Sequence, residues 1–118
     1  MAAEKNFENK VKKFLKDKGA WLLKYWGGAA YTKSGIPDLL VCLDGFFFGI
    51  EIKADKGEPS LLQLYNLRKI RDAGGYGILL YPQDFELFKM FIAKKPEPNL
   101  WYLSNIEDQK CWEMKLSK

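Results

Sequence analysis

Two adjacent residues, Asp44 and Gly45, separate two apolar runs and constrain the fold more than any other part of the chain. The first run covers residues 37–43 and the second covers residues 46–54. An Asp-Gly pair between strand-like segments is typical of a two-residue β-hairpin turn, because that turn requires a positive φ at its central residues. The sequence therefore predicts an antiparallel hairpin, and the short turn also fixes which residues face each other.

The register of this hairpin brings ionisable side chains together. With a two-residue turn, Leu43 faces Phe46 and Asp38 faces Glu51. Side chains alternate between the faces of a strand, so Lys53 lies on the same face as Glu51. Two opposed carboxylates repel each other, and a divalent cation between them would reverse that effect. A Glu-x-Lys pattern is common, so an exposed ion pair on an edge strand is the alternative interpretation.

The remaining pattern predicts an α/β fold in which a mixed sheet is flanked by helices. Ser60 and Gln63 form a capping-box pattern at the start of the second predicted helix. The apolar strand that follows this helix is expected to be central in the sheet. We expect one domain over residues 1–118. Its predicted elements, in chain order, are a helix at 4–18, strands at 20–26, 37–43 and 46–54, a helix at 60–73, a strand at 76–81, a helix at 82–95 and a last strand at 101–103.

Composition limits the chemistry. The chain has no histidine and only two cysteines, so a zinc site or an imidazole base is not expected. A bound metal would then need oxygen ligands, which favours Mg²⁺, Mn²⁺ or Ca²⁺. Cys42 lies in an apolar run and is expected in the core. No apolar stretch reaches the ~20 residues of a membrane span, and no signal peptide is visible. We therefore expect a cytosolic protein with no membrane partner.

Three stretches occur in an order that resembles the PD-(D/E)xK nuclease superfamily. They are Gly-Ile-Pro-Asp-Leu-Leu at 35–40, Ile-Glu-Ile-Lys-Ala at 50–54, and Gln63. Within that superfamily the chain resembles the VRR-NUC family, which groups with archaeal-type Holliday-junction resolvases, over residues 8–81. The resemblance implies a restriction-endonuclease-like core of order αβββαβ. It also implies a metal-dependent endodeoxyribonuclease that hydrolyses phosphodiester bonds.

The resemblance implies a role for each matching residue. Asp38 and Glu51 would bind Mg²⁺, with the backbone carbonyl of Ile52 as a candidate third ligand, and Mn²⁺ would be able to substitute. Lys53 would orient or help to deprotonate the attacking water and neutralise the scissile phosphate. Gln63 corresponds to the catalytic glutamine that the family carries on a helix near the lysine. Its role in the capping box is compatible with this if the helix begins against the site.

The family also carries an acidic residue on its first helix. Glu8 is the best match, because its spacing from Val11 and Leu15 places it beside the buried stripe of the predicted helix. Glu4 lies one turn earlier on the same side and is the second candidate. Surface exposure is the alternative for both glutamates.

The net charge of +4 suits a polyanionic partner without requiring one. Lys33, Ser34 and Tyr31 precede the Pro-Asp turn and are candidates for phosphate contacts, with an ordinary loop as the alternative. Lys10 and Lys13 are candidates for steering a DNA backbone, with a solvated helix face as the alternative. The tryptophans are expected in the core or a subunit interface rather than stacked on bases: Trp21, Trp26, Trp101 and Trp112.

The leading hypothesis is a structure-selective DNA endonuclease that acts as a homodimer on branched DNA, such as four-way junctions, in a bacterial or phage-infected cell. One alternative is a less selective nuclease or nickase of the phage or defence type. A second alternative is a nucleic-acid-binding module without catalysis.

Overall fold

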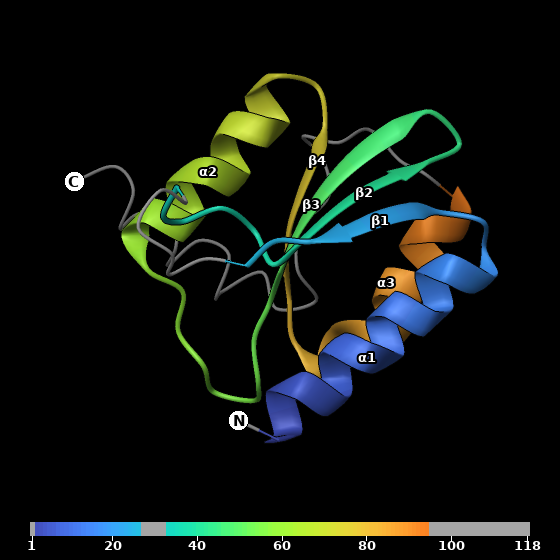
Figure 1. Cartoon of the computed structure of the whole chain (residues 1–118), viewed down its shortest axis with the longest axis horizontal. Helices are drawn as coiled ribbons and strands as arrows, with labels where there is room; N and C mark the ends of the chain where they lie inside the picture. Colours follow the sequence, from blue (N-terminus) through green and yellow to red (C-terminus); the bar gives the residue numbers. More distant parts are fainter. Residues whose placement is uncertain (1, 27–32, 95–118) are drawn as a thin grey trace.

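The computed structural model describes residues 2–26 and 33–94 and shows a mixed four-stranded sheet with helices on both faces (Figure 1). The α/β class predicted from the sequence is confirmed. The described elements are α1 (Ala2–Asp17), β1 (Trp21–Lys24), β2 (Leu39–Leu43), β3 (Phe46–Ile52), α2 (Leu61–Asp72), β4 (Tyr76–Leu80), the 3-10 helix η1 (Pro82–Asp84) and α3 (Phe85–Lys94).

The β2–β3 hairpin has the predicted register. Leu43 pairs with Phe46, and the same pairing continues in step to the other end of β2. Asp44 and Gly45 have φ values of 53° and 85°, as the two central residues of such a turn require. Asp38 directly precedes β2, so the two strands carry it to the position opposite Glu51.

The other two strands extend this hairpin on either side. β1 pairs antiparallel with β2, and β4 pairs parallel with β3, so the strand order is β1-β2-β3-β4. The expectation that β4 is central is wrong for the described sheet, where β4 lies at one end. All five residues of β4 are nevertheless buried, because helices cover both of its faces. The predicted strand at 101–103 lies outside the described residues.

Helices α1 and α3 form one layer (Figure 1). The buried stripe of α1 is Phe7, Val11 and Leu15, which recur every four residues as a helix packed on a sheet requires. The Phe85 ring of α3 meets the Phe7 ring edge-on at 5.7 Å and the Phe14 ring at 6.0 Å. This layer fixes the orientation of α1, and therefore the direction in which its polar residues point.

Helix α2 lies on the opposite face, over β3 and β4. Gly49 and Gly77 are side by side in these strands. A Cβ atom at Gly77 would collide with the backbone of Leu67 in α2, and a Cβ at Gly49 would lie 2.5 Å from Ile70 Cδ1. The two glycines therefore allow α2 to approach the sheet closely, which brings the first turn of α2 to the end of β3.

Of the described helices, none covers the part of the sheet next to β1 on this face. Trp21, Cys42 and Phe47 occupy adjacent positions across β1, β2 and β3. Cys42 is exposed, and Trp21 and Phe47 are 62% and 44% exposed. The expectation of a core position is therefore wrong for Cys42. Trp21, and Trp26, which is 69% exposed, do not lie in the core either, and a place in a subunit interface stays a prediction for both. Their apolar character predicted burial, but α2 sits over β3 and β4 instead.

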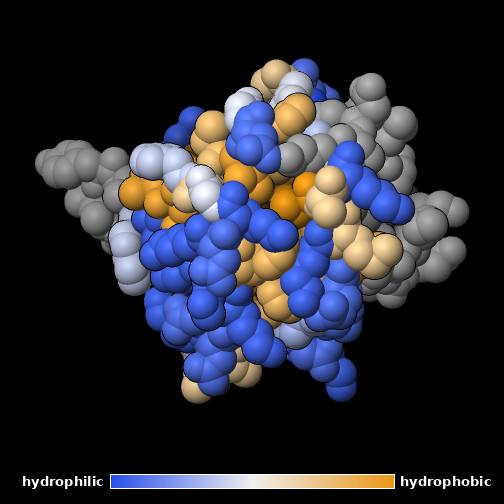
Figure 2. All heavy atoms as spheres, turned by 90° about the vertical axis from the view of Figure 1, so that its right-hand side faces the viewer, coloured by the Kyte–Doolittle hydropathy of each residue, from blue (hydrophilic) through white to orange (hydrophobic). Residues whose placement is uncertain are grey.

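Trp101 and Trp112 lie outside the described residues. Figure 2 shows one face of the molecule, on which groups of hydrophobic residues are exposed between hydrophilic ones. None of the helices in the described part of the chain is long and apolar enough to cross a membrane.

Candidate active site

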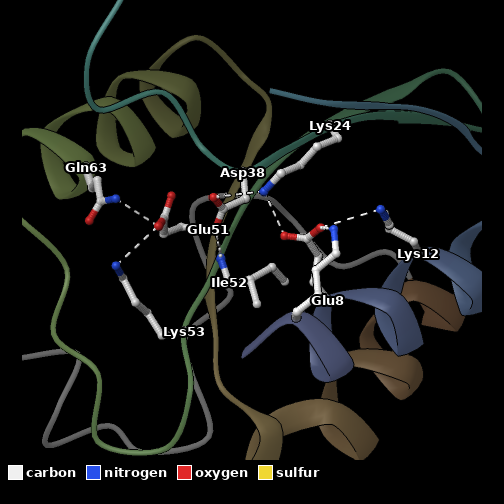
Figure 3. A network of polar contacts seen from close by, with 9 residues as sticks. Glu8, Lys12, Lys24, Asp38, Glu51, Ile52, Lys53 and Gln63 are labelled. Atoms are coloured by element: carbon white, nitrogen blue, oxygen red, sulfur yellow. Dashed lines mark hydrogen bonds and ion pairs between the residues drawn. The ribbon is translucent and has the colours of Figure 1, made fainter. Parts of the chain in front are cut away.

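Asp38 is held at the end of the hairpin away from the turn, between α1 and the first turn of α2 (Figure 3). Its backbone carbonyl accepts a hydrogen bond of 2.8 Å from Tyr25 N, which continues the β1–β2 pairing. Its Oδ2 atom accepts a hydrogen bond of 2.8 Å from the backbone N–H of Ile52. Asp38 is thus fixed by both neighbouring strands, while its side chain stays 24% exposed.

Glu51 lies beside Asp38 and is only 2% exposed. Its Oε2 atom accepts a hydrogen bond of 2.9 Å from Gln63 Nε2 and lies 3.4 Å from Lys53 Nζ. Its Oε1 atom is buried and has no hydrogen-bond partner within the described part of the chain. A buried carboxylate oxygen without a partner is unfavourable, because desolvation is then uncompensated.

The pKa of Glu51 reflects this uncompensated desolvation. Burial, together with the negative charge of Asp38, raises the pKa of Glu51 from 4.5 to about 8, although Lys53 acts in the opposite direction. Metal-free Glu51 is therefore largely protonated at neutral pH. A group that is buried, strongly perturbed and beside a second carboxylate is typical of a functional site.

Lys53 follows Glu51 on the same face, as the hairpin register predicted. Its side chain is 16% exposed, and its stem lies against the loop at Gly57. That loop is held by Tyr81, whose hydroxyl donates a hydrogen bond of 2.7 Å to the Gly57 carbonyl. The contact with this loop therefore supports the aliphatic part of the Lys53 side chain, whose ammonium lies near Glu51.

Gln63 forms the predicted capping box and also reaches the candidate metal ligand Glu51. Its backbone N–H donates to Ser60 Oγ at 3.1 Å, and its Oε1 accepts from Ser60 N at 2.8 Å, which completes the capping box. Its Nε2 remains available and donates to Glu51. The cap thus fixes the amide in the orientation that reaches Glu51.

Glu8 is 4% exposed and points toward Asp38 from α1. Its Oε1 lies 2.7 Å from Lys24 Nζ, while its Oε2 lies 3.4 Å from Lys5 Nζ and 3.5 Å from Lys12 Nζ. Burial alone would raise the pKa of Glu8, but the hydrogen bond from Lys24 and the three ammonium charges lower it. Glu8, rather than the partly exposed Glu4, is therefore the acidic residue of α1 nearest the site.

Two residues of the site were not predicted from the sequence. Lys24 Nζ lies 2.7 Å from Glu8 Oε1 and 3.4 Å from Asp38 Oδ1, and so joins the two carboxylates. Asn66, in α2, donates a hydrogen bond of 3.1 Å to the carbonyl of Gly35. This bond ties the turn that precedes Asp38 to α2. Asn66 lies three residues after Gln63 on the same helix face, which was the available signal.

The candidate DNA contacts are only partly described. Lys33 and Ser34 are exposed, and Tyr31 lies outside the described residues. Lys10 and Lys13 are exposed on α1, and Lys13 pairs with Asp17 at 3.2 Å. Helical spacing turns both lysines away from Glu8 and brings Lys5 and Lys12 to it instead, because residues three or four apart share a face.

Asp38 and Glu51 suit a divalent cation that prefers oxygen ligands. The unpartnered Oε1 of Glu51 is directed into the site beside Asp38, and a cation there would compensate both charges. The backbone N–H of Ile52 donates its hydrogen bond to Asp38 Oδ2. Within residues 2–26 and 33–94, no three acidic, cysteine or histidine side chains surround one point. A third ligand would then come from the backbone or from water.

No model of a known protein family matches the sequence, and no curated protein matches it. A solved structure described as a VRR_NUC domain is similar to this chain, with 22% sequence identity and a TM-score of 0.59. The match covers 77% of this chain and 95% of that chain. The fold implied by the sequence resemblance is therefore confirmed: this chain has the restriction-endonuclease-like fold of a VRR_NUC domain.

Proposed function

We propose that this protein is a Mg²⁺-dependent DNA endonuclease that hydrolyses phosphodiester bonds. The observation that carries the proposal is the buried Glu51 carboxylate, which lies beside Asp38 and Lys53 and has one oxygen without a hydrogen-bond partner among the described residues. The fold supports it, because a solved structure of the same fold is described as a VRR_NUC domain. Mn²⁺ is expected to replace Mg²⁺, since both ions accept carboxylate and water ligands.

Each side chain has a distinct task in this proposal. Asp38 and Glu51 hold the divalent cation, with the carbonyl of Ile52 as a further candidate ligand. When bound, such an ion polarises a phosphodiester and lowers the pKa of a coordinated water. Lys53 neutralises charge on the scissile phosphate and orients the attacking water, and Gln63 keeps the Glu51 carboxylate in place.

The preferred substrate is proposed to be branched DNA, and in particular a four-way junction. This step rests on the resemblance to the VRR-NUC family and on the small size of the domain. A two-fold homodimer would supply two sites for cuts on opposed strands. A less selective nuclease is the alternative enzyme, and a catalytically silent binding module is the alternative outside enzymes.

The decisive assay measures cleavage of an end-labelled four-way junction and of a linear duplex of matched sequence, with Mg²⁺. The wild type is compared with Lys53→Ala and with Lys89→Ala, a control that removes a lysine paired with Glu86 away from the site. We expect Lys53→Ala to lose most of the activity and Lys89→Ala to keep it. Equal cleavage by wild type and Lys53→Ala would rule out the mechanism. Equal cleavage of duplex and junction would rule out the substrate preference.

Metal binding separates an enzyme from a silent binding module. A cation that binds the folded state alone raises the unfolding temperature. We expect Mg²⁺ or Mn²⁺ to raise it for the wild type and to leave Asp38→Asn unchanged. An equal shift in both proteins would place the cation elsewhere, and a metal-independent unfolding temperature would favour the binding module.

A further inference from the structure

The two buried carboxylates of this site are neutralised to very different extents. Glu8 faces three ammonium groups within 3.5 Å, from Lys5, Lys12 and Lys24. Glu51 faces the ammonium of Lys53 at 3.4 Å, and its Oε1 atom has no hydrogen-bond partner in the described part of the chain. One carboxylate is therefore fully compensated by the protein's own charges, and the other is not.

Lys24 is held firmly in its position between the carboxylates of α1 and the hairpin. Its Nζ atom lies 2.7 Å from Glu8 Oε1 and 3.4 Å from Asp38 Oδ1, and its side chain is 19% exposed. The ring of Trp26 lies 5.4 Å from the same ammonium, which adds a cation–π contact. Figure 3 shows Lys24 reaching from β1 into the space between Asp38 and Glu8.

This arrangement determines where a divalent cation can bind. Beside Glu8 it would meet Lys24 first, because this ammonium lies closest to the carboxylate, at 2.7 Å against 3.4 Å for Lys5 and 3.5 Å for Lys12. Lys24 also has the least exposed side chain of the three, 19% against 51% and 21%, so its repulsion of a second cation is the least screened by water. Beside Glu51 the cation would meet an uncompensated carboxylate instead. Lys24 also separates Glu8 from Asp38, in accord with the absence of a three-acid cluster among the described residues.

We propose that Lys24 is a positioning residue that serves as the fixed cation of this site: it bridges Glu8 to Asp38, keeps Glu8 out of the metal-ligand set and limits the chain to one divalent ion. This inference rests on the proposed nuclease function and deepens it. Asp38 and Glu51 bind the single ion, and Glu8 acts by holding Lys24 rather than by binding metal.

The test counts Mn²⁺ ions bound per chain, without DNA, by electron paramagnetic resonance of the free ion and by calorimetric titration. The variants are Lys24→Met and Lys24→Gln, which remove the charge, and Lys24→Arg, which keeps it. Lys24→Gln retains a donor for Glu8, and it replaces Lys24→Met if that variant does not fold. Lys13→Met is the matched control, because it removes one lysine from an ion pair elsewhere on α1.

We expect one Mn²⁺ per chain for the wild type, Lys24→Arg and Lys13→Met, and a second ion for Lys24→Met and Lys24→Gln. Adding Glu8→Gln to either neutral variant should abolish the second ion, because Glu8 is its ligand. One ion in both neutral variants, or two ions in the wild type, would overturn the role of Lys24 and leave the nuclease proposal standing. A wild type that binds no Mn²⁺ would overturn the nuclease proposal itself.

Discussion

Gln63 donates a hydrogen bond from Nε2 to Glu51 Oε2 over 2.9 Å, and the other oxygen of Glu51 has no partner in the described residues. The contact joins the start of α2 to the end of β3. It depends on the capping box, because Ser60 fixes the opposite end of the Gln63 amide. The capping box of α2 and the candidate metal ligand Glu51 therefore belong to one hydrogen-bonded network.

The first prediction concerns stability against pH without metal. Burial and Asp38 raise the pKa of Glu51 from 4.5 to about 8, so between these values the folded chain holds a proton that the unfolded chain has lost. Stability should therefore fall as pH rises from 4.5 to about 8. Glu51→Gln should remove this slope and stabilise the metal-free protein at pH 8 by on the order of a few kcal/mol.

Chemical denaturation at several pH values, with a chelator present, measures both quantities. Glu8 has a lowered pKa, so it contributes stability that is lost only as pH falls below 4.5, and the two effects occupy different pH ranges. A wild type whose stability stays level over the range assigned to Glu51, or a destabilised Glu51→Gln, would contradict the prediction.

The second prediction concerns the protons released on metal binding. Below pH 8 a cation must displace the proton that Glu51 holds, so binding should release protons and tighten as pH rises to about 8. Calorimetric titration with Mn²⁺ in two buffers of different ionisation enthalpy measures the release. We expect the apparent enthalpy to differ between the buffers at pH 6.5 and to agree at pH 9. The same enthalpy in both buffers at the lower pH would show that Glu51 binds no proton there.

The third prediction separates the two roles of Gln63. Gln63→Ala removes its side chain's half of the cap and the hydrogen bond to Glu51. Ser60→Ala removes only the hydroxyl half of the cap, and the Ser60 backbone N–H still holds the Gln63 amide. Each should destabilise the protein by about 1 kcal/mol. Only Gln63→Ala should also weaken Mn²⁺ binding, because Glu51 then loses its donor. Thermal unfolding and Mn²⁺ titration of both variants test this. Equal Mn²⁺ affinities of the two variants would show that Gln63 serves only as a helix cap.

The hairpin and its acidic end were predictable because a two-residue turn fixes the register of both strands. Once Asp44 and Gly45 form the turn, the positions of Asp38, Glu51 and Lys53 follow by alternation. The capping box was visible in the same way. These signals are local, so their geometry follows from a few neighbouring residues.

Lys24 was not predictable in this way, because its place depends on contacts between distant segments. A long connection separates β1 from β2, and such a connection permits any register between the two strands. The observed pairing of Lys24 with Leu39 directs its ammonium toward Glu8. The exposure of Cys42 was missed for a related reason, because the sequence does not state which strands α2 covers.

The fourth prediction tests the close approach of α2, which brings Gln63 to Glu51. Gly77→Ala places a methyl group against the backbone of Leu67, so the helix must move. Gly49→Ala, in the adjacent strand, meets the flexible end of Ile70 at 2.5 Å and the Pro37 ring at 3.2 Å, but no backbone atom of α2 within 4 Å among its three nearest neighbours. We expect Gly77→Ala to destabilise the protein by roughly 2–4 kcal/mol and Gly49→Ala by about 1 kcal/mol. Gly77→Ala should also weaken Mn²⁺ binding, because a displaced α2 withdraws the donor from Glu51. Urea denaturation and Mn²⁺ titration measure the two effects, and an equal loss of stability in both variants would show that backbone contact does not set this distance.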